Sequence, residues 1–153
     1  MCIRDSQDTR KDCSRCHELQ KVFFEGGNSN GLVIPQDIMS EAEVSCTDCH
    51  LNSQNQIFRL DGNHCLSCHD EKYKNTFYEW QNSIKNLIIF LKNSFKEKRK
   101  LALSDEDKAQ ILEMEKVVQK IELDRSFGVH NYSFIQGTLT KFQEQIKSIK
   151  KDP

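Results

Sequence analysis

The chain has 153 residues, of which 37% are hydrophobic and 29% charged, and its formal net charge is -1. This length predicts one small domain or the end of a larger protein. With no global positive field to gather phosphates, the composition gives no support for nucleic-acid binding. The longest apolar run, residues 87–91, is far shorter than the stretch of about 18 residues that predicts a bilayer-spanning helix, so a membrane span is excluded within these residues. Even with glycine included, the apolar content is roughly 41%, below the ~45–50% of ordinary globular domains, which leaves room for a bulky cofactor in the interior.

The pattern along the chain predicts three regions. Residues 1–12 form an N-terminal tail. Residues 13–72 contain three cysteine motifs and are poor in regular structure, because turn signals at Gly26–Gly31 and Asp61–Asn63 and the helix breaker Pro35 interrupt them. Residues 73–151 are predicted to be helical.

The helical region contains three amphipathic segments. Apolar residues at intervals of three and four predict a first helix from Tyr73 that ends in the basic run 96–100, which we interpret as a solvated face rather than a docking patch. Ser104 is the expected N-cap of a second helix, with acidic residues in its first turn. Gly128 is expected to interrupt this helix, and Asn131 to cap a third. The predicted fold is mostly α, with a loop-rich cluster followed by a helical hairpin plus a third helix.

The helices also carry aromatic residues that either belong to an ordinary core or flank a cofactor. These residues are Phe77, Trp80 and Tyr132.

Six of the seven cysteines occur in three C-x-x-C-H units. The units are Cys13-Ser14-Arg15-Cys16-His17, Cys46-Thr47-Asp48-Cys49-His50 and Cys65-Leu66-Ser67-Cys68-His69. This is the motif of covalent c-type haem attachment, in which the two thiols add to the haem vinyl groups and the histidine ligates the iron from the proximal side. The sequence therefore predicts three covalent haem c groups. Cys2 lies outside the pattern.

A structural zinc site is the strongest alternative for the cysteines. The spacing between the second and third pairs is within the range of a C-x2-C…C-x2-C zinc site. With 5 His in 153 residues, however, the chance that histidine follows all three pairs is about 3 in 100,000. A four-ligand zinc site also leaves one pair unexplained. A disulfide framework needs no histidine, and a redox pair of the thioredoxin type needs a βαβ pattern that the sequence lacks.

Three haems need three distal ligands if each iron is six-coordinate. His130 and His64 are the two histidines outside the motifs, and an isolated histidine is often only a surface or core residue. In a chain whose other histidines all bind iron, we predict that both act as distal ligands. Met39 is the third candidate, and a thioether ligand would raise the reduction potential, although Met39 could equally pack on a porphyrin edge.

The C-x-x-C-H units, the long helices and the segment Gly128-Val129-His130-Asn131 together resemble the C-terminal portion of multihaem c-type cytochromes. That superfamily includes cytochrome c nitrite reductase, hydroxylamine oxidoreductase and related enzymes, as well as electron carriers. The resemblance implies that His130 reaches an upstream haem as its distal ligand. Two features of the enzymes are missing: no C-x-x-C-K motif occurs, and nothing marks a tyrosine for a haem crosslink.

We therefore expect electron transfer in a periplasmic respiratory chain, with redox partner proteins such as a quinol-oxidising membrane cytochrome, a terminal reductase or another cytochrome. Catalysis is less expected, because the chain offers enough candidates to fill all six axial positions. The alternatives are that the chain is the C-terminal part of a multihaem reductase acting on nitrite, hydroxylamine or a sulfur oxyanion, or that it is a zinc-binding interaction module.

The N-terminal residues do not resemble a signal peptide, although covalent haem attachment takes place outside the cytoplasm. The sequence 1–6 is similar to the translated adapter scars found at the ends of assembled environmental sequences. We expect a truncated reading frame in which residues from about 7 onward belong to a longer cytochrome, so that Cys2 has no functional meaning.

Overall fold

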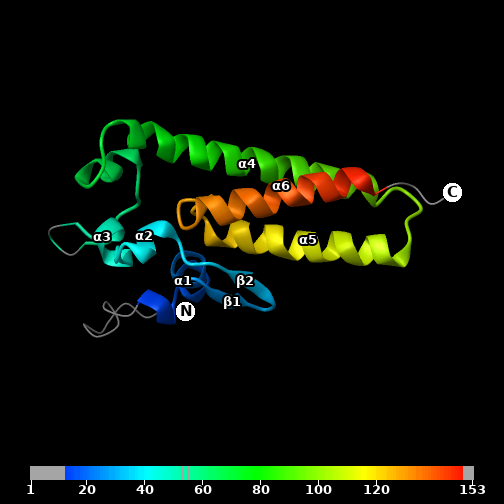
Figure 1. Ribbon diagram of the computed structural model, residues 1–153, viewed down its shortest axis with the longest axis horizontal. Coiled ribbons are helices and arrows are strands. Elements are labelled where there is room, and N and C mark those ends of the chain that lie inside the picture. The colour runs from blue at the N-terminus through cyan, green and yellow to red at the C-terminus, as the bar shows by residue number, and fades with distance from the viewer. Residues whose placement is uncertain (1–12, 53, 55, 150–153) are drawn as a thin grey trace. The chain divides into compact units, whose positions relative to one another are not determined.

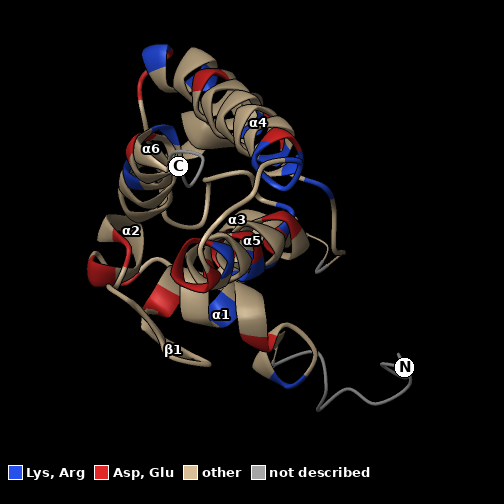
Figure 2. Cartoon of the chain, turned by 90° about the vertical axis from the view of Figure 1, so that its right-hand side faces the viewer, with Lys and Arg blue, Asp and Glu red and all other residues tan. Residues whose placement is uncertain are grey.

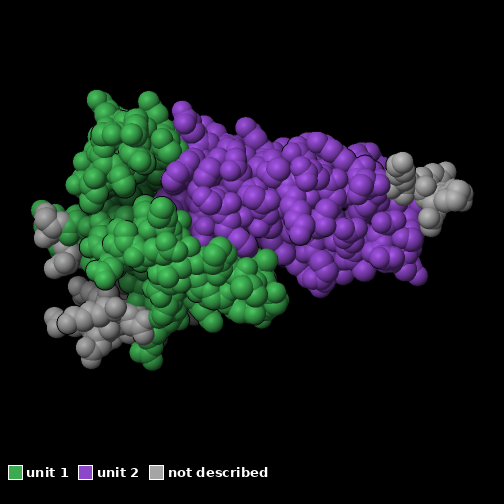
Figure 3. Space-filling model, in the orientation of Figure 1, with its two compact units in different colours: residues 1–77 green, residues 78–153 purple. Residues whose placement is uncertain are grey.

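The computed structural model describes residues 13–52, 54 and 56–149 (Figure 1). The predicted tail, residues 1–12, lies outside these ranges. The chain divides into two compact units, residues 1–77 and 78–153 (Figure 3). No helix in the described part of the chain has both the length and the apolar character needed to cross a membrane. The prediction of a mostly helical protein is confirmed.

The first unit consists of short elements. In chain order they are the 3-10 helix η1 (Cys13–Arg15), α1 (Glu18–Glu25), β1 (Gly27–Ser29), β2 (Leu32–Ile34), α2 (Ile38–Glu41), α3 (Cys46–His50), the 3-10 helix η2 (Gly62–Ser67) and the start of α4 (Lys72–Lys98). The strands pair antiparallel, with Gly27 opposite Ile34. Their two-residue turn has positive φ at both Asn30 (51°) and Gly31 (88°), as the tightest hairpin turns require. The sequence correctly indicated a turn here but not the flanking strands.

The second unit is a bundle of the remainder of α4, α5 (Asp105–Asp124) and α6 (Tyr132–Ser148). Each helix contributes one buried apolar stripe. The stripes consist of Ile84, Ile88, Leu91 and Phe95 from α4, Ile111, Met114, Val118 and Ile121 from α5, and Ile135, Leu139 and Ile146 from α6. Their spacing of three and four residues is the helical period that the sequence showed.

The predicted caps of α5 and α6 are both present. The Ser104 hydroxyl accepts a hydrogen bond from the backbone N–H of Asp107 at 3.1 Å, and the Asn131 side chain accepts one from the N–H of Phe134 at 3.3 Å. The end of α5 differs from the prediction. The helix stops at Asp124 because Arg125 takes the left-handed conformation (φ 63°), and Gly128 lies within the following turn rather than at the helix end.

The basic run at the end of α4 is largely paired. Arg99 forms an ion pair with Glu115, and Lys100 forms one with Glu97 at 2.7 Å. The ammonium of Lys98 donates to the carbonyl of Ile149, just beyond the end of α6. Figure 2 shows charges of both signs interspersed on α4 and α5. These pairings agree with the interpretation of this run as a solvated face.

Candidate haem-binding site

Each of the three motifs folds as a single helical turn. In the first motif the N–H of His17 donates to the carbonyl of Cys13 at 2.9 Å, and in the third the N–H of His69 donates to the carbonyl of Cys65 at 2.9 Å. The second motif is the whole of α3. A helical turn brings residues three apart onto one face, so the two thiols of each motif lie on the same side of the backbone, as attachment to one porphyrin edge requires.

The second motif is held in its helical form by a capping box. Ser45 donates its hydroxyl to the carboxylate of Asp48 at 2.6 Å, and its backbone N–H donates to the same oxygen at 2.8 Å. These two hydrogen bonds keep the pKa of Asp48 below its ordinary value. The cap therefore fixes the start of the helix directly at Cys46, the first thiol of the motif.

The thiols of the second motif lie within electrostatic reach of the other two motifs. Burial raises the pKa of the Cys46 thiol, and the charge of Cys13 adds to the effect. Burial is also the largest cause of the raised pKa of Cys49. The charge of Asp48 raises this pKa further, and the charges of Cys65 and Cys68 have a smaller effect in the same direction. Since Cys46 interacts with the first motif and Cys49 with the third, the second motif lies between them.

The thiols of Cys46, Cys49 and Cys65 are partly withdrawn from solvent, and this burial raises the pKa of each. Within the described residues, no three His, Cys, Asp or Glu side chains converge as a possible metal-binding group. Five motif cysteines carry free thiols, but Cys16 is disulfide-bonded.

The first unit also exposes aliphatic side chains of the kind that a haem ring covers. Val33, Ile38 and Ile57 are 70%, 75% and 69% exposed. Val33 lies in β2, Ile38 is the first residue of α2, and Ile57 forms an isolated bridge with Leu51, the residue after the second motif.

The three predicted proximal ligands occupy the C-terminal end of their motif turns. His17 is the residue preceding α1, His50 ends α3, and His69 follows η2. The ring of His69 stacks on that of Tyr73, with 4.3 Å between centroids. This stacking restricts the rotation of the His69 imidazole.

The candidate distal ligand His64 lies in η2, immediately before the third motif. Its Nδ1 is 3.2 Å from a carboxylate oxygen of Asp61 and 3.4 Å from the backbone N of the same residue. The ring also stacks on Phe58, with a centroid distance of 4.2 Å. Several contacts therefore orient His64. The other candidate in this unit, Met39, is half-buried in α2, where its N–H donates to Asp37 at 2.9 Å.

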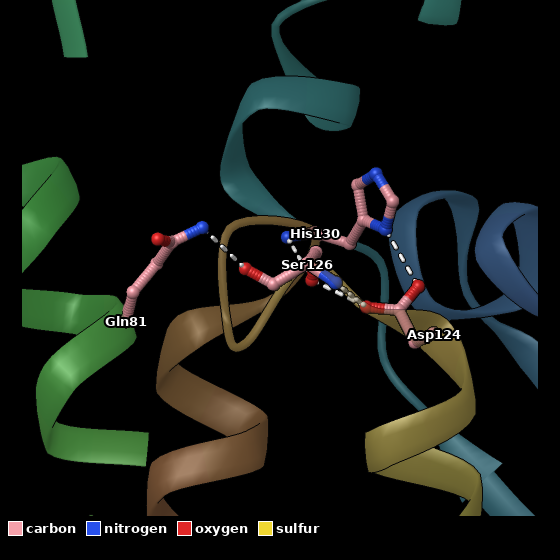
Figure 4. Close-up of polar contacts among 4 residues, drawn as sticks. All are labelled: Gln81, Asp124, Ser126 and His130. Atoms are coloured by element: carbon pink, nitrogen blue, oxygen red, sulfur yellow. Dashed lines mark hydrogen bonds and ion pairs between the residues drawn. The ribbon is translucent and has the colours of Figure 1, made fainter. Parts of the chain in front are cut away.

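The candidate distal ligand His130 belongs to the second unit and lies in the turn between α5 and α6 (Figure 4). Its Nδ1 is 2.6 Å from Oδ1 of Asp124, the last residue of α5. The helix junction predicted for His130 is thus confirmed. Trp80 and Tyr132, considered above as haem neighbours, stack on each other at 4.7 Å with an interplanar angle of 9°.

The sequence did not single out the carboxylates that contact the two distal candidates. The contact at His64 had a usable signal, because Asp61 and His64 have the spacing of an N-terminal capping box. The contact at His130 had none, since Asp124 precedes it by six residues across an irregular turn. The structure places the three motifs in the first unit and His130 in the second, and the ligand assignments themselves stay predictions.

Comparisons with known proteins identify the fold. No protein-family model and no curated protein matches the chain. The crystal structure of the outer cell wall cytochrome OcwA, however, superposes with a TM-score of 0.73 at 23% sequence identity. The chain shares the fold of part of OcwA. The match covers 90% of this chain and 34% of OcwA, so the chain spans about a third of the length of that cytochrome. The expected resemblance to multihaem cytochromes is confirmed at the level of the fold.

Proposed function

We propose that the chain carries three covalent haem c groups and transfers electrons through them outside the cytoplasm. The observation that carries this proposal is that all three C-x-x-C-H motifs fold as one helical turn with both thiols on one side. The cytochrome fold shared with OcwA supports it. So does the histidine that directly follows each pair of cysteines, which a zinc site would not require.

Each haem would be held by the residues of its own motif. The thioethers would form at Cys13 and Cys16, at Cys46 and Cys49, and at Cys65 and Cys68. His17, His50 and His69 would be the proximal ligands, with His130, His64 and Met39 as the distal ones. Bound haem supplies a one-electron iron couple, and its axial ligands, hydrogen bonding and burial set the potential.

The chain contributes the arrangement of these sites. The second motif lies between the other two, so the backbone holds three attachment points in a compact cluster. A carrier of this kind needs redox proteins as partners, such as a quinol-oxidising membrane cytochrome, a terminal reductase or another cytochrome. A periplasmic or other extracytoplasmic location agrees with covalent haem attachment and with the outer cell wall location of OcwA.

Haem content tests this function directly. The chain would be expressed with a secretion signal and the haem maturation machinery, and the denatured mass and the pyridine haemochrome spectrum would be recorded. We expect three haems in the wild type, two after replacing Cys46 and Cys49 by serine, and three in the control Cys2→Ser. Stoichiometric zinc without Soret absorption would overturn the proposal in favour of the zinc module.

The axial ligands have separate tests. His130→Ala is expected to convert one low-spin ferric haem to high spin, and an unchanged spectrum would remove His130 from the ligand set. Met39→Leu is expected to abolish the near-infrared charge-transfer band of methionine ligation. If the wild type instead contains a high-spin haem that binds cyanide or nitrite rapidly, the chain belongs to the reductase class.

A further inference from the structure

The side chain of Asp124 is fully buried, with 0% of its surface exposed, and each of its oxygens has a defined partner. Oδ1 faces Nδ1 of His130 at 2.6 Å. Oδ2 accepts from the backbone N–H of Ser126 at 3.2 Å and from the hydroxyl of the same serine. A buried carboxylate that accepts several hydrogen bonds is a strongly oriented group.

The turn that carries these residues is fixed by its own contacts. The Ser126 hydroxyl accepts from the backbone N–H of His130 at 3.2 Å, and the Ser126 carbonyl accepts from the Gln81 amide of α4 at 3.1 Å (Figure 4). Lys85 of α4 lies over the ring of Phe127, 4.8 Å from its centroid. Two residues of the neighbouring helix thus hold the turn that positions His130.

We propose that Asp124 is a positioning residue that fixes His130 in the tautomer whose Nε2 binds haem iron, and that it lowers the reduction potential of that haem. The inference rests on the proposed function, because it requires His130 to be a haem ligand. It adds a group outside the ligand set that determines how this ligand behaves.

The chemistry follows from the donor and acceptor roles. An ionised carboxylate can only accept hydrogen bonds, so the short contact places the proton of a neutral His130 on Nδ1. In this tautomer the lone pair is on Nε2, the nitrogen that would coordinate the iron. Metal-ligating histidines commonly donate their other N–H to a carboxylate, which raises the basicity of the ligand. A more basic imidazole favours ferric over ferrous iron and so lowers the potential.

The contacts of His64 differ in one decisive respect. Its Nδ1 faces both a carboxylate oxygen of Asp61, to which it would donate, and the backbone N–H of Asp61, from which it would accept. These two contacts require opposite tautomers. Asp61 is also exposed, and its pKa is lowered mainly by the backbone N–H of Asn63 rather than by the histidine. The arrangement at His130 is therefore the one that selects a single tautomer.

The test compares Asp124→Asn with Asp105→Asn in the full haem-loaded chain. Both variants remove one negative charge from α5, but Asp105 is fully exposed at the other end of the helix, about 28 Å away along the axis. The haem that His130→Ala turns high-spin is first identified by its spectrum. Spectroelectrochemistry then measures the potential of that haem in each variant.

We expect Asp124→Asn to lower the affinity of His130 for ferric iron, relative to its affinity for ferrous iron, about ten-fold. This is the lower end of the loss of metal affinity seen when a ligating histidine loses its hydrogen-bond partner. For a one-electron couple this raises the potential by about 59 mV. Asp105→Asn should leave the potential unchanged. Asp124→Glu, which keeps the carboxylate, should restore most of the wild-type potential, whereas a purely structural role of Asp124 predicts no such recovery.

The outcomes separate the two hypotheses. If His130→Ala alters no haem, the ligand assignment fails, and this inference fails with it. If His130→Ala alters one haem but Asp124→Asn leaves its potential equal to that of Asp105→Asn, the assignment stands and the role of Asp124 is overturned. If Asp124→Asn does not fold, Asp124→Glu decides: the proposal predicts a potential close to that of the wild type, and a rise of about 59 mV or more despite the retained carboxylate would refute it.

Discussion

Replacing Gly128 by alanine should damage the turn that carries His130. Gly128 has φ +101°, and a Cβ built there would lie 2.9 Å from Cγ1 of Ile84 and 3.2 Å from Cδ2 of Tyr132. An L-residue with this backbone conformation costs roughly 1–3 kcal/mol. Forcing a methyl group against the fully buried Ile84 adds overpacking of roughly 1–3 kcal/mol. We expect Gly128→Ala to destabilise the chain by about 2–6 kcal/mol in total.

Thermal unfolding followed by circular dichroism at 222 nm measures this effect. For a unit of this size, each kcal/mol lost corresponds to a fall in Tm of roughly 4–8 °C, so the expected fall is at least about 8 °C. Gly137→Ala is the matched control, because Gly137 lies inside α6 with nothing within 4 Å of the added Cβ. Helix propensity predicts that the control is stabilised by about 0.5–1 kcal/mol. If Gly128→Ala melts within about 2 °C of the wild type, the packing argument at this turn is refuted.

Two further predictions concern the ends of the bundle helices. Ser104→Ala removes the N-cap of α5 and should lower the free energy of unfolding by about 1 kcal/mol. The control Ser133→Ala, on the exposed face of α6, should change it by less than about 0.5 kcal/mol. Equal losses for the two variants in a denaturant titration would contradict the role of the cap. Hydrogen bonds from Lys108 and Lys100 lower the pKa values of Asp105 and Glu97. A carboxyl group whose pKa is depressed by folding contributes stability above its ordinary pKa and loses that contribution as the pH falls through the folded value. The small difference in Tm between the wild type and the double variant Asp105→Asn, Glu97→Gln should therefore be present at pH 7 and vanish near pH 2, and a difference that grows in acid would show the sign to be wrong.

The sequence was most informative where a feature depends on neighbouring residues. The caps at Ser104 and Asn131 and the helical stripes of the bundle are local patterns, and the structure contains all of them. The sequence analysis did not predict α1, which has eight residues, or the three-residue strands of the hairpin. Elements this short are defined by turn geometry and by packing on one another rather than by a repeated pattern.

The environment of the candidate ligands was the least predictable part of the site. The three motifs were evident from residue type and spacing, but their relative placement, with the second motif between the others, depends on the folded chain. The contact between Asp124 and His130 depends on the left-handed conformations of Arg125 and Phe127. Nothing in those two side chains favours positive φ, so the shape of this turn follows from tertiary packing.

The position of Asp124 also has a consequence for stability. As the last residue of a 20-residue helix, it places a negative charge at the negative end of the helix macrodipole. This arrangement opposes folding by about 0.3–1 kcal/mol, so residues selected for helix stability alone would not include a carboxylate here. A variant with a neutral residue at position 124 should be free of this unfavourable interaction with the helix dipole, but it would no longer hold the His130 ring by a carboxylate. Under the proposed function, the end of α5 would give up some stability of the free chain to orient a haem ligand, a cost that haem binding would offset.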